Sequence, residues 1–386
     1  MKKILATVLA LVMALALCTT SWADGVKPIT AEMTGLDTGS YELTGDVTLT
    51  AGALTVKSGA IVTLDLGTFT LTNKAGEHTI VNNGTLTITG TGTVDNVSHA
   101  RAALFNNEGA TAVLNGGSFT RSQENGKTKE DSGNNSFYTI QNLGTMTINA
   151  GVSVTQNGCF SSMVANGYYN GTGKTNTPTM IINGGTFSGG LNTVKNDDCG
   201  VMTINGGEFK NFAQACVQNH NKLTITNGNF DGSELKAIAD STVSVIYNCG
   251  CGADNDKGML SISGGTFSGG KEETYVICDV STVSEAYTDI SGGTFTKGSA
   301  TMIGKTASAK VAISGGAFKD AAGKAVDVSA YLAAGKQQNS DGSVGNKSYY
   351  YYPSTSDTTT STTTKGSPKT FDAVSYTHLR AHETRR

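Results

Sequence analysis

A short segment that recurs at a nearly constant interval constrains the fold of this chain more than any other feature. It occurs as Met180-Ile-Ile-Asn-Gly-Gly-Thr-Phe187, as Met202-Thr-Ile-Asn-Gly-Gly-Glu-Phe209 and as Leu223-Thr-Ile-Thr-Asn-Gly-Asn-Phe230. The three phenylalanines are 22 and 21 residues apart. Self-similarity at such a period is typical of solenoid proteins, in which each repeat packs only on its neighbours.

Each repeat combines one strand with one tight corner. Apolar and hydroxyl residues alternate before the glycines, which indicates a strand with one buried face. Paired glycines allow the positive φ of a tight corner, and the phenylalanine then returns to the interior. A block of about 22 residues is too short for a strand–helix crossover. We therefore predict an all-β protein, a right-handed single-stranded parallel β-helix of roughly ten coils, with Ile and Phe stacked in columns inside.

The corner motif recurs beyond these three copies, and a second short sequence motif repeats with the same period. Further corners end at Phe119, Phe267, Phe295 and Phe318. The second motif is an apolar residue, any residue and then Asn. Its copies end at Asn83, Asn107, Asn142, Asn166, Asn196, Asn219 and Asn248, with Asp279 in the same position of a later repeat. Asn tolerates corner geometry, and stacked Asn side chains hydrogen-bond one another. We predict structural ladders here rather than a ligand site.

The regions outside the repeats differ in composition. Residues 1–23 carry two lysines, an apolar core and a small-x-small site, so we expect a secretory signal cleaved between Ala23 and Asp24. Cys18 leaves a lipoprotein signal as the alternative. We expect a lead-in and cap over 24–45, the β-helix over 46–320 and a C-terminal cap over 321–352. That cap is predicted to contain a short helix over 327–335 and a hairpin that turns at Asp341-Gly342.

The last residues are predicted to be a tether. Residues 353–373 are rich in Ser and Thr and end in a remnant of a sorting signal, Pro368, Lys369 and Thr370. Residues 374–386 resemble one reading frame of a sequencing adapter, and we exclude them from functional inference. Without this segment and the two lysines of the leader, the formal charge changes from −3 to −7. An acidic solenoid gives no reason to expect nucleic-acid binding, and no segment after the leader is apolar enough to span a membrane.

Cysteines and acidic residues give no clear metal motif. Six cysteines follow the leader, which allows a disulfide or two but not a disulfide-dependent fold. Cys249-Gly-Cys251 has neither a second pair nor a His at zinc spacing, and the segment 254–258 lacks the distal Glu of a calcium loop. We therefore predict neither a metal site nor a cofactor.

Two groups of residues are candidates for function. Asp197 and Asp198 follow the Asn196 corner, and His220 follows the Asn219 corner one repeat later, so the three side chains can lie close together and are the candidates for a catalytic site. A solvated corner cluster is the structural alternative. Tyr168 and Tyr169 fall in an insertion over 167–177, where aromatic faces can stack on sugar rings. Other insertions lie at 121–136, 232–242, 249–257 and 281–288, and in repeat proteins such loops often carry binding.

The repeats resemble those of Firmicutes cell-surface β-helix proteins with Gly-Gly-Thr-Phe motifs. The segments 62–71 and 327–343 are similar to the opening and closing segments of that family. The resemblance implies a pectin-lyase-like fold and an adhesin-like role at the Gram-positive cell wall, with an extracellular glycan or host surface as partner. Our first expectation is therefore a secreted, non-catalytic β-helix. A polysaccharide lyase or hydrolase of the pectin-lyase-like type and a passive spacer are the alternatives.

Overall fold

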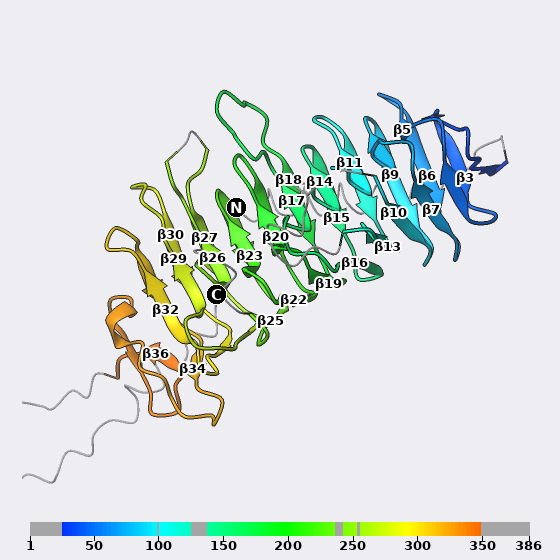
Figure 1. The fold of residues 1–386 in the computed structure, drawn as a ribbon. Coiled ribbons are helices and arrows are strands. Elements are labelled where there is room, and N and C mark those ends of the chain that lie inside the picture. Colours follow the sequence, from blue (N-terminus) through cyan, green and yellow to red (C-terminus); the bar gives the residue numbers. More distant parts are fainter. Residues whose placement is uncertain (1–24, 99, 125–136, 236–241, 253–254, 349–386) are drawn as a thin grey trace, which may run out of the picture. The chain divides into compact units, whose positions relative to one another are not determined.

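The chain forms a stack of coils built from three parallel sheets. The structure, a computed structural model, describes residues 25–98, 100–124, 137–235, 242–252 and 255–348. The described residues from 25 to Lys347 lie in one compact unit, in which each complete coil contributes one strand to each sheet (Figure 1). The predicted parallel β-helix is therefore confirmed. The predicted leader with Ala23 and Asp24, and the predicted anchor motif Pro368, Lys369 and Thr370, lie outside the described residues.

We call the sheets A, B and C. Each coil passes through them in the order B, A, C, and all strand pairs within these sheets are parallel. Sheet A contains twelve strands: β1 (Lys27–Pro28), β3 (Gly39–Glu42), β6 (Ile61–Asp65), β9 (Thr85–Thr89), β12 (Thr111–Leu114), β15 (Thr145–Ile148), β18 (Thr179–Ile182), β21 (Val201–Ile204), β24 (Lys222–Ile225), β27 (Met259–Ile262), β30 (Tyr287–Ile290) and β33 (Val311–Ile313).

Sheets B and C contain eleven strands each. Sheet B consists of β2 (Gly35–Leu36), β5 (Leu54–Val56), β8 (Ile80–Asn82), β11 (Leu104–Asn106), β14 (Ile140–Asn142), β17 (Val164–Asn166), β20 (Asn192–Asn196), β23 (Ala215–Asn219), β26 (Ser244–Asn248), β29 (Tyr275–Asp279) and β32 (Thr301–Lys305). Sheet C consists of β4 (Val47–Leu49), β7 (Thr70–Asn73), β10 (Thr93–Asn96), β13 (Gly117–Thr120), β16 (Val152–Gln156), β19 (Thr186–Gly189), β22 (Glu208–Lys210), β25 (Asn229–Gly232), β28 (Thr266–Gly269), β31 (Thr294–Thr296) and β34 (Ala317–Lys319).

The repeated phenylalanines form a buried stack inside sheet C, as predicted. Phe187, Phe209 and Phe230 pair in register. The stack continues through Phe267 and Phe295 to Phe318, with ring centroids 4.6–4.9 Å apart and planes within 6° of parallel. This spacing matches the distance between neighbouring strands, so the backbone period sets the ring period.

The two glycines of the corner are required for two different physical reasons. Gly185 has a φ of 106°, a conformation that side chains with a Cβ rarely adopt. At Gly264, by contrast, a Cβ would lie 2.2 Å from the carbonyl oxygen of Thr226 in the preceding coil. The second glycine of the motif therefore turns the chain, and the first allows neighbouring coils to approach.

Asparagines at the ends of the sheet B strands form a ladder that we call the inner ladder. Each side-chain Nδ2 donates to the side chain of the next coil over 2.7–3.1 Å, and all members are buried. The members are Asn82, Asn106, Asn142, Asn166, Asn196, Asn219, Asn248 and Asp279. In the first two coils of this ladder, those of β8 and β11, the predicted register was wrong by one residue. Asn83 and Asn107 are not in the inner ladder, and they form a separate side-chain pair outside it.

The C-terminal cap differs from the prediction. No α-helix forms over 327–335, where the structure has only a three-residue 3-10 turn, η1 (Ser329–Tyr331). Backbone bonding to the last coil competes with the helix, because Ala333 donates to the carbonyl oxygen of Ile313 at 2.8 Å. An antiparallel hairpin of β35 (Lys336–Gln338) and β36 (Val344–Asn346) follows, with Asp341-Gly342 in its turn.

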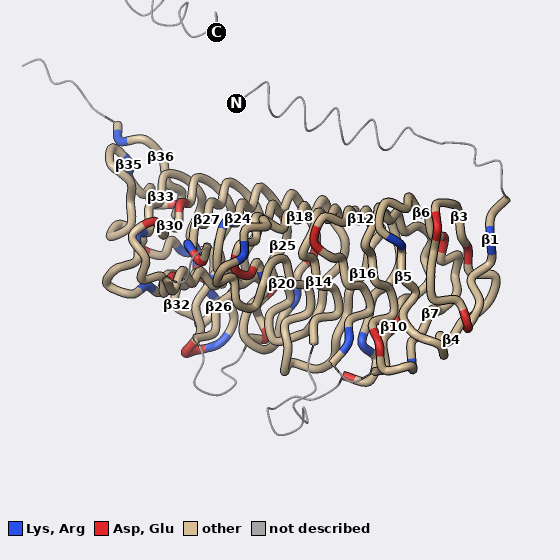
Figure 2. The backbone as a smooth tube through the Cα atoms, turned by 90° about the horizontal axis from the view of Figure 1, so that it is seen from above, with Lys and Arg blue, Asp and Glu red and all other residues tan. Residues whose placement is uncertain are grey.

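Two surface properties bear on function. No helix among the described residues is long and apolar enough to cross a membrane. Acidic and basic positions are interspersed along the coils, without a long stretch of one sign in the part of the chain that is drawn in colour (Figure 2). The six cysteines of the described chain are all free thiols, and Cys251 alone among them is exposed.

Candidate functional site

Two of the insertions pack together above the middle coils. The segment 167–177 leaves the corner after β17, and 249–257 leaves the equivalent corner after β26 (Figure 1). Tyr168 and Asp198 exchange backbone hydrogen bonds of 3.0 and 3.1 Å. The next residue, Cys199, donates its N–H to the carbonyl oxygen of Asn255 at 2.9 Å. The coil that carries Asp198 is therefore held between both insertions.

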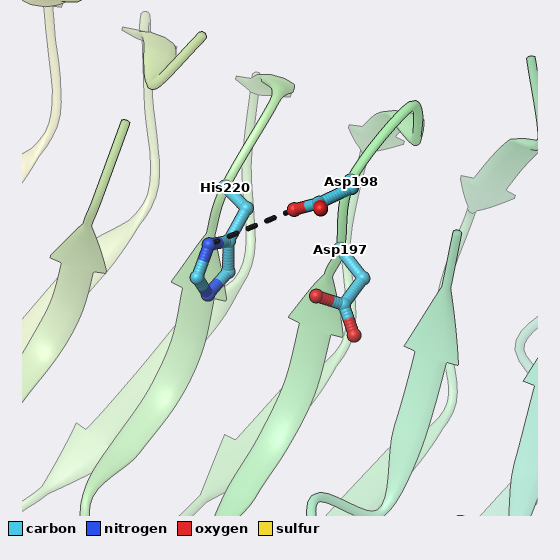
Figure 3. A group of neighbouring side chains, drawn as sticks. All are labelled: Asp197, Asp198 and His220. Atoms are coloured by element: carbon cyan, nitrogen blue, oxygen red, sulfur yellow. Dashed lines mark ion pairs between the residues drawn. The ribbon is translucent and has the colours of Figure 1, made fainter. Parts of the chain in front are cut away.

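The catalytic candidates meet at this corner. Asn196 and Asn219 pair in register, so the residues that follow them in the chain are neighbours across the coils. His220 Nδ1 lies 4.0 Å from Asp198 Oδ1 (Figure 3). Asp197, Asp198 and His220 each offer one potential metal-ligating atom, and these atoms lie within 4.8 Å of one another. The structure thus brings together the three residues that sequence reasoning singled out.

Asp197 is committed to two neighbours. Its Oδ1 lies 3.1 Å from Lys195 Nζ, and its Oδ2 accepts a hydrogen bond of 3.2 Å from the hydroxyl of Tyr138. Burial and the charge of this carboxylate raise the pKa of Tyr138 well above its ordinary value. Asp197 therefore lies beside a cation and a phenol that keeps its proton, which leaves it poorly placed to act as a free base.

Asp198 is held differently. Its Oδ2 accepts a hydrogen bond of 2.9 Å from the backbone N–H of Gly171, in the first insertion. Burial raises the pKa of Asp198, and the charges of Asp197 and Asp256 add to that shift, while the Gly171 hydrogen bond and His220 oppose it. A carboxyl with a raised pKa beside a histidine has the properties of a general acid.

Sequence reasoning missed a fourth member, Asp256. Its Oδ1 lies 3.6 Å from His220 Nδ1, and its Oδ2 accepts a hydrogen bond of 3.0 Å from the backbone N–H of Cys251. The only available signal was that it belongs to the calcium-loop-like segment 254–258. The sequence does not show that this insertion folds back over the corner of His220. We call Asp197, Asp198, His220 and Asp256 the acid–histidine cluster.

The insertion also places a thiol beside the cluster. A hydrogen bond from the Cys249 thiol is the largest cause that lowers the pKa of Cys251 to about 7. Burial and the carboxylates Asp256 and Asp198 oppose this shift, and His220 reinforces it. Cys249 and Cys251 were predicted not to hold a metal because no histidine lies at zinc spacing in the sequence.

The predicted aromatic patch is divided by the structure. Tyr168 is buried, and its hydroxyl donates to Glu108 Oε1 at 2.6 Å. Tyr169 is 82% exposed, and Lys195 Nζ lies 5.5 Å from the centre of its ring. Lys195 thus contacts both Tyr169 and Asp197, so the exposed ring lies next to the acid–histidine cluster.

A pocket opens between the two insertions. It has a volume of about 540 Å³, and its lining includes Lys174 from the first insertion and Asn255 and Asp256 from the second. Asp256 therefore connects the pocket to the acid–histidine cluster. Carboxyls and an imidazole beside an open pocket can serve proton transfer, cation binding or recognition of a polar ligand. Comparison with protein-family models, curated proteins and solved structures gives no match for this chain.

Proposed function

We propose that this protein is a secreted, adhesin-like β-helix that contacts extracellular glycans without transforming them. The exposed ring of Tyr169 supports this proposal most directly. Among the described residues, the other large hydrophobic side chains that are exposed are Val26 and Ile61, at 54% and 53%. Tyr169 is the aromatic one of the three, and it is also the most exposed.

The surroundings of Tyr169 suit a sugar. A tyrosine ring offers a rigid apolar face at low conformational cost, and polar groups beside it can bind hydroxyls. Lys195 lies beside the ring. The preceding residue, Tyr168, is fixed by its hydrogen bond to Glu108 and by its backbone bonds to Asp198. A ring on a fixed base loses little freedom on binding, which favours affinity.

A glycan array tests the proposal. We expect the intact chain to bind a subset of glycans, Tyr169→Ala to lose at least tenfold in affinity, and Tyr169→Phe to retain binding because the ring is kept. Ile61→Ala is the matched control, because it removes an exposed apolar side chain from a distant coil. Equal binding by the intact chain and Tyr169→Ala would contradict the proposal.

A polysaccharide lyase or hydrolase is the second candidate. The convergence of Asp198, His220 and Asp256 favours it, because polysaccharide hydrolysis commonly uses two carboxyl groups. The test is release of reducing ends or unsaturated uronates from a polysaccharide panel. Activity that Asp198→Asn abolishes would establish an enzyme. A chain that neither binds nor cleaves glycans would be a passive spacer.

The proposal includes attachment to a Gram-positive cell wall. Its support is the sequence alone: the leader over 1–23 and the remnant Pro368-Lys369-Thr370. Mass spectrometry of the exported protein would test the first part. We expect the mature chain to begin at Asp24, and an uncleaved leader or a lipid on Cys18 would contradict that expectation.

A further inference from the structure

Two polar atoms of the acid–histidine cluster are buried without a hydrogen-bond partner. These atoms are Oδ1 of Asp256 and Nε2 of His220, for which the described residues supply no hydrogen-bond partner. The side chain of Asp256 is only 7% exposed, and the unpartnered oxygen faces the imidazole of His220. Buried polar groups in native proteins are almost always satisfied, so the unpartnered oxygen of Asp256 calls for an explanation such as an unseen ion. The unpartnered Nε2 of His220 is the ring nitrogen that does not face the two carboxylates, and it does not enter the argument.

The spacing around His220 Nδ1 has the scale of a coordination sphere. Asp256 Oδ1 lies 3.6 Å away and Asp198 Oδ1 lies 4.0 Å away. Both distances are longer than an N–H···O hydrogen bond, which rarely exceeds about 3.2 Å. Two ligands that lie about 2.1 Å from one ion are about 3–4.2 Å apart, depending on the angle between them. The observed distances fall within that range.

The two carboxyl groups are oriented by backbone donors that leave one oxygen of each uncommitted to the backbone. Gly171 N–H bonds Oδ2 of Asp198, and Cys251 N–H bonds Oδ2 of Asp256. In each residue it is Oδ1 that faces His220. Such outer hydrogen bonds fix first-shell ligands in metal sites.

Asp197 has a different role. Lys195 and Tyr138 engage its two oxygens, so it lies beside the site without an oxygen to spare. One of its carboxylate oxygens lies within 4.8 Å of the ligand atoms of Asp198 and His220, so it adds to the acidic character of the site although Lys195 offsets its charge.

We infer that Asp198, His220 and Asp256 bind a divalent transition-metal ion of the zinc type. One imidazole nitrogen and two carboxylate oxygens suit such ions, and three protein ligands leave a position open to the adjoining pocket. Calcium and magnesium favour sites made entirely of oxygen. The ion links the insertion 249–257 to two coils of the β-helix. This inference does not depend on the proposed glycan contact.

Metal titration of the mature chain tests this inference. The chain is freed of metal with a chelator, dialysed, and titrated with zinc by calorimetry, with calcium in a parallel arm. We expect one zinc ion per chain, a higher unfolding temperature with zinc, and weaker binding of calcium. No zinc binding at micromolar concentrations, or calcium binding as tight as zinc, would overturn the inference.

Two variants test His220 and Asp256 as ligands. His220→Ala and Asp256→Asn should each weaken zinc binding at least tenfold, and Asp256→Asn keeps the side-chain shape so that the fold is retained. Asp289→Asn, which changes a solvent-exposed carboxylate on β30, should bind zinc like the parent. Tyr169→Ala should also bind zinc normally, which separates this site from the glycan contact. Unchanged affinity in both His220→Ala and Asp256→Asn would overturn the assignment.

Discussion

Two ladders of asparagine follow the same coils, one inside the β-helix and one on its surface. The inner ladder is buried throughout. The second, which we call the outer ladder, uses the Asn of the Asn-Gly-Gly corner and its equivalents, and consists of Asn115, Asn149, Asn183 and Asn205. Its side-chain bonds are 2.7–3.0 Å long, nearly the same as those inside. Bond length therefore does not distinguish the two ladders.

The environment does distinguish them. Asn142 of the inner ladder also donates to the carbonyl oxygen of Thr179 at 2.9 Å and accepts from the N–H of Gly144 at 3.2 Å. If its side chain is removed, the buried N–H of Gly144 and the part-buried carbonyl oxygen of Thr179 lose this partner. Asn149 of the outer ladder lies beside solvent, and water can take over its bonds. The same residue in the same repeat is thus a structural requirement at one corner and a minor contribution at the other.

The two ladders also run in opposite directions. Inside, Asn82 donates to Asn106, so each side chain donates toward the C-terminal coils. Outside, Asn149 donates back to Asn115. The inner series ends at Asp279, which accepts from Asn248 and has no hydrogen to donate when ionised.

The largest effect is expected from breaking the inner ladder. Asn142→Ala should lower the free energy of unfolding by about 3 kcal/mol or more, because several buried donors and acceptors lose their partner at about 1–3 kcal/mol each. Chemical denaturation of the parent and the variant measures this difference. A loss below 1 kcal/mol would mean that buried water repairs the gap.

A smaller effect is expected at the end of the inner ladder. Oδ1 of Asp279 accepts from Ser281 N–H at 2.9 Å, and Oδ2 accepts from Thr288 Oγ1 at 2.7 Å and from Asn248. In Asp279→Asn one oxygen becomes an NH₂ group that faces a donor, so we expect a loss of about 1–2 kcal/mol in the free energy of unfolding.

Denaturation of Asp279→Asn beside Asp289→Asn tests this. The control removes a carboxylate from the next strand of the chain, where the side chain is exposed. If Asp279→Asn proved as stable as the parent, an acceptor without hydrogens would not be required at this position.

The smallest effect is expected in the outer ladder. Asn149 follows Asn142 by seven residues in the same coil, so Asn149→Ala is the matched partner of the first variant. We expect a change of about 0.5 kcal/mol or less in the free energy of unfolding, as for most surface substitutions. A loss equal to that of Asn142→Ala would show that burial does not separate the ladders.

Most of the fold was predictable because the same strand-and-corner motif occurs in many successive coils. Phe187, Phe209 and Phe230 share one environment, and their spacing alone indicated the stack. Prediction of the inner ladder was wrong at its first two members because two asparagines are adjacent there, and only the strand pairing and burial show that Asn82 rather than Asn83 belongs to the ladder. The prediction of a helix over 327–335 was wrong because helix propensity is a local property. It does not account for the unpaired edge of the last coil, to which this segment bonds instead.

The candidate site was predictable only where it belongs to the repeat. Asp198 and His220 occupy neighbouring corners, so their proximity followed from the period. Asp256 lies in an insertion, whose path no repeat dictates. Tyr168 and Tyr169 are consecutive, and only tertiary contacts decide that the first is buried and the second exposed.

The carboxylate at Asp279 has a consequence for how such a protein can lengthen. From Asn106 to Asn248, each side chain accepts a hydrogen bond from the preceding coil and donates one to the next coil, so a duplicated coil inserted among them would leave the series intact. A copy placed after Asp279 would receive nothing from it. In the present chain the next residue in that register is Lys305, which turns its amine to backbone carbonyls instead. A coil that follows this aspartate must therefore satisfy the residue in this register in another way, as the coil of Lys305 does.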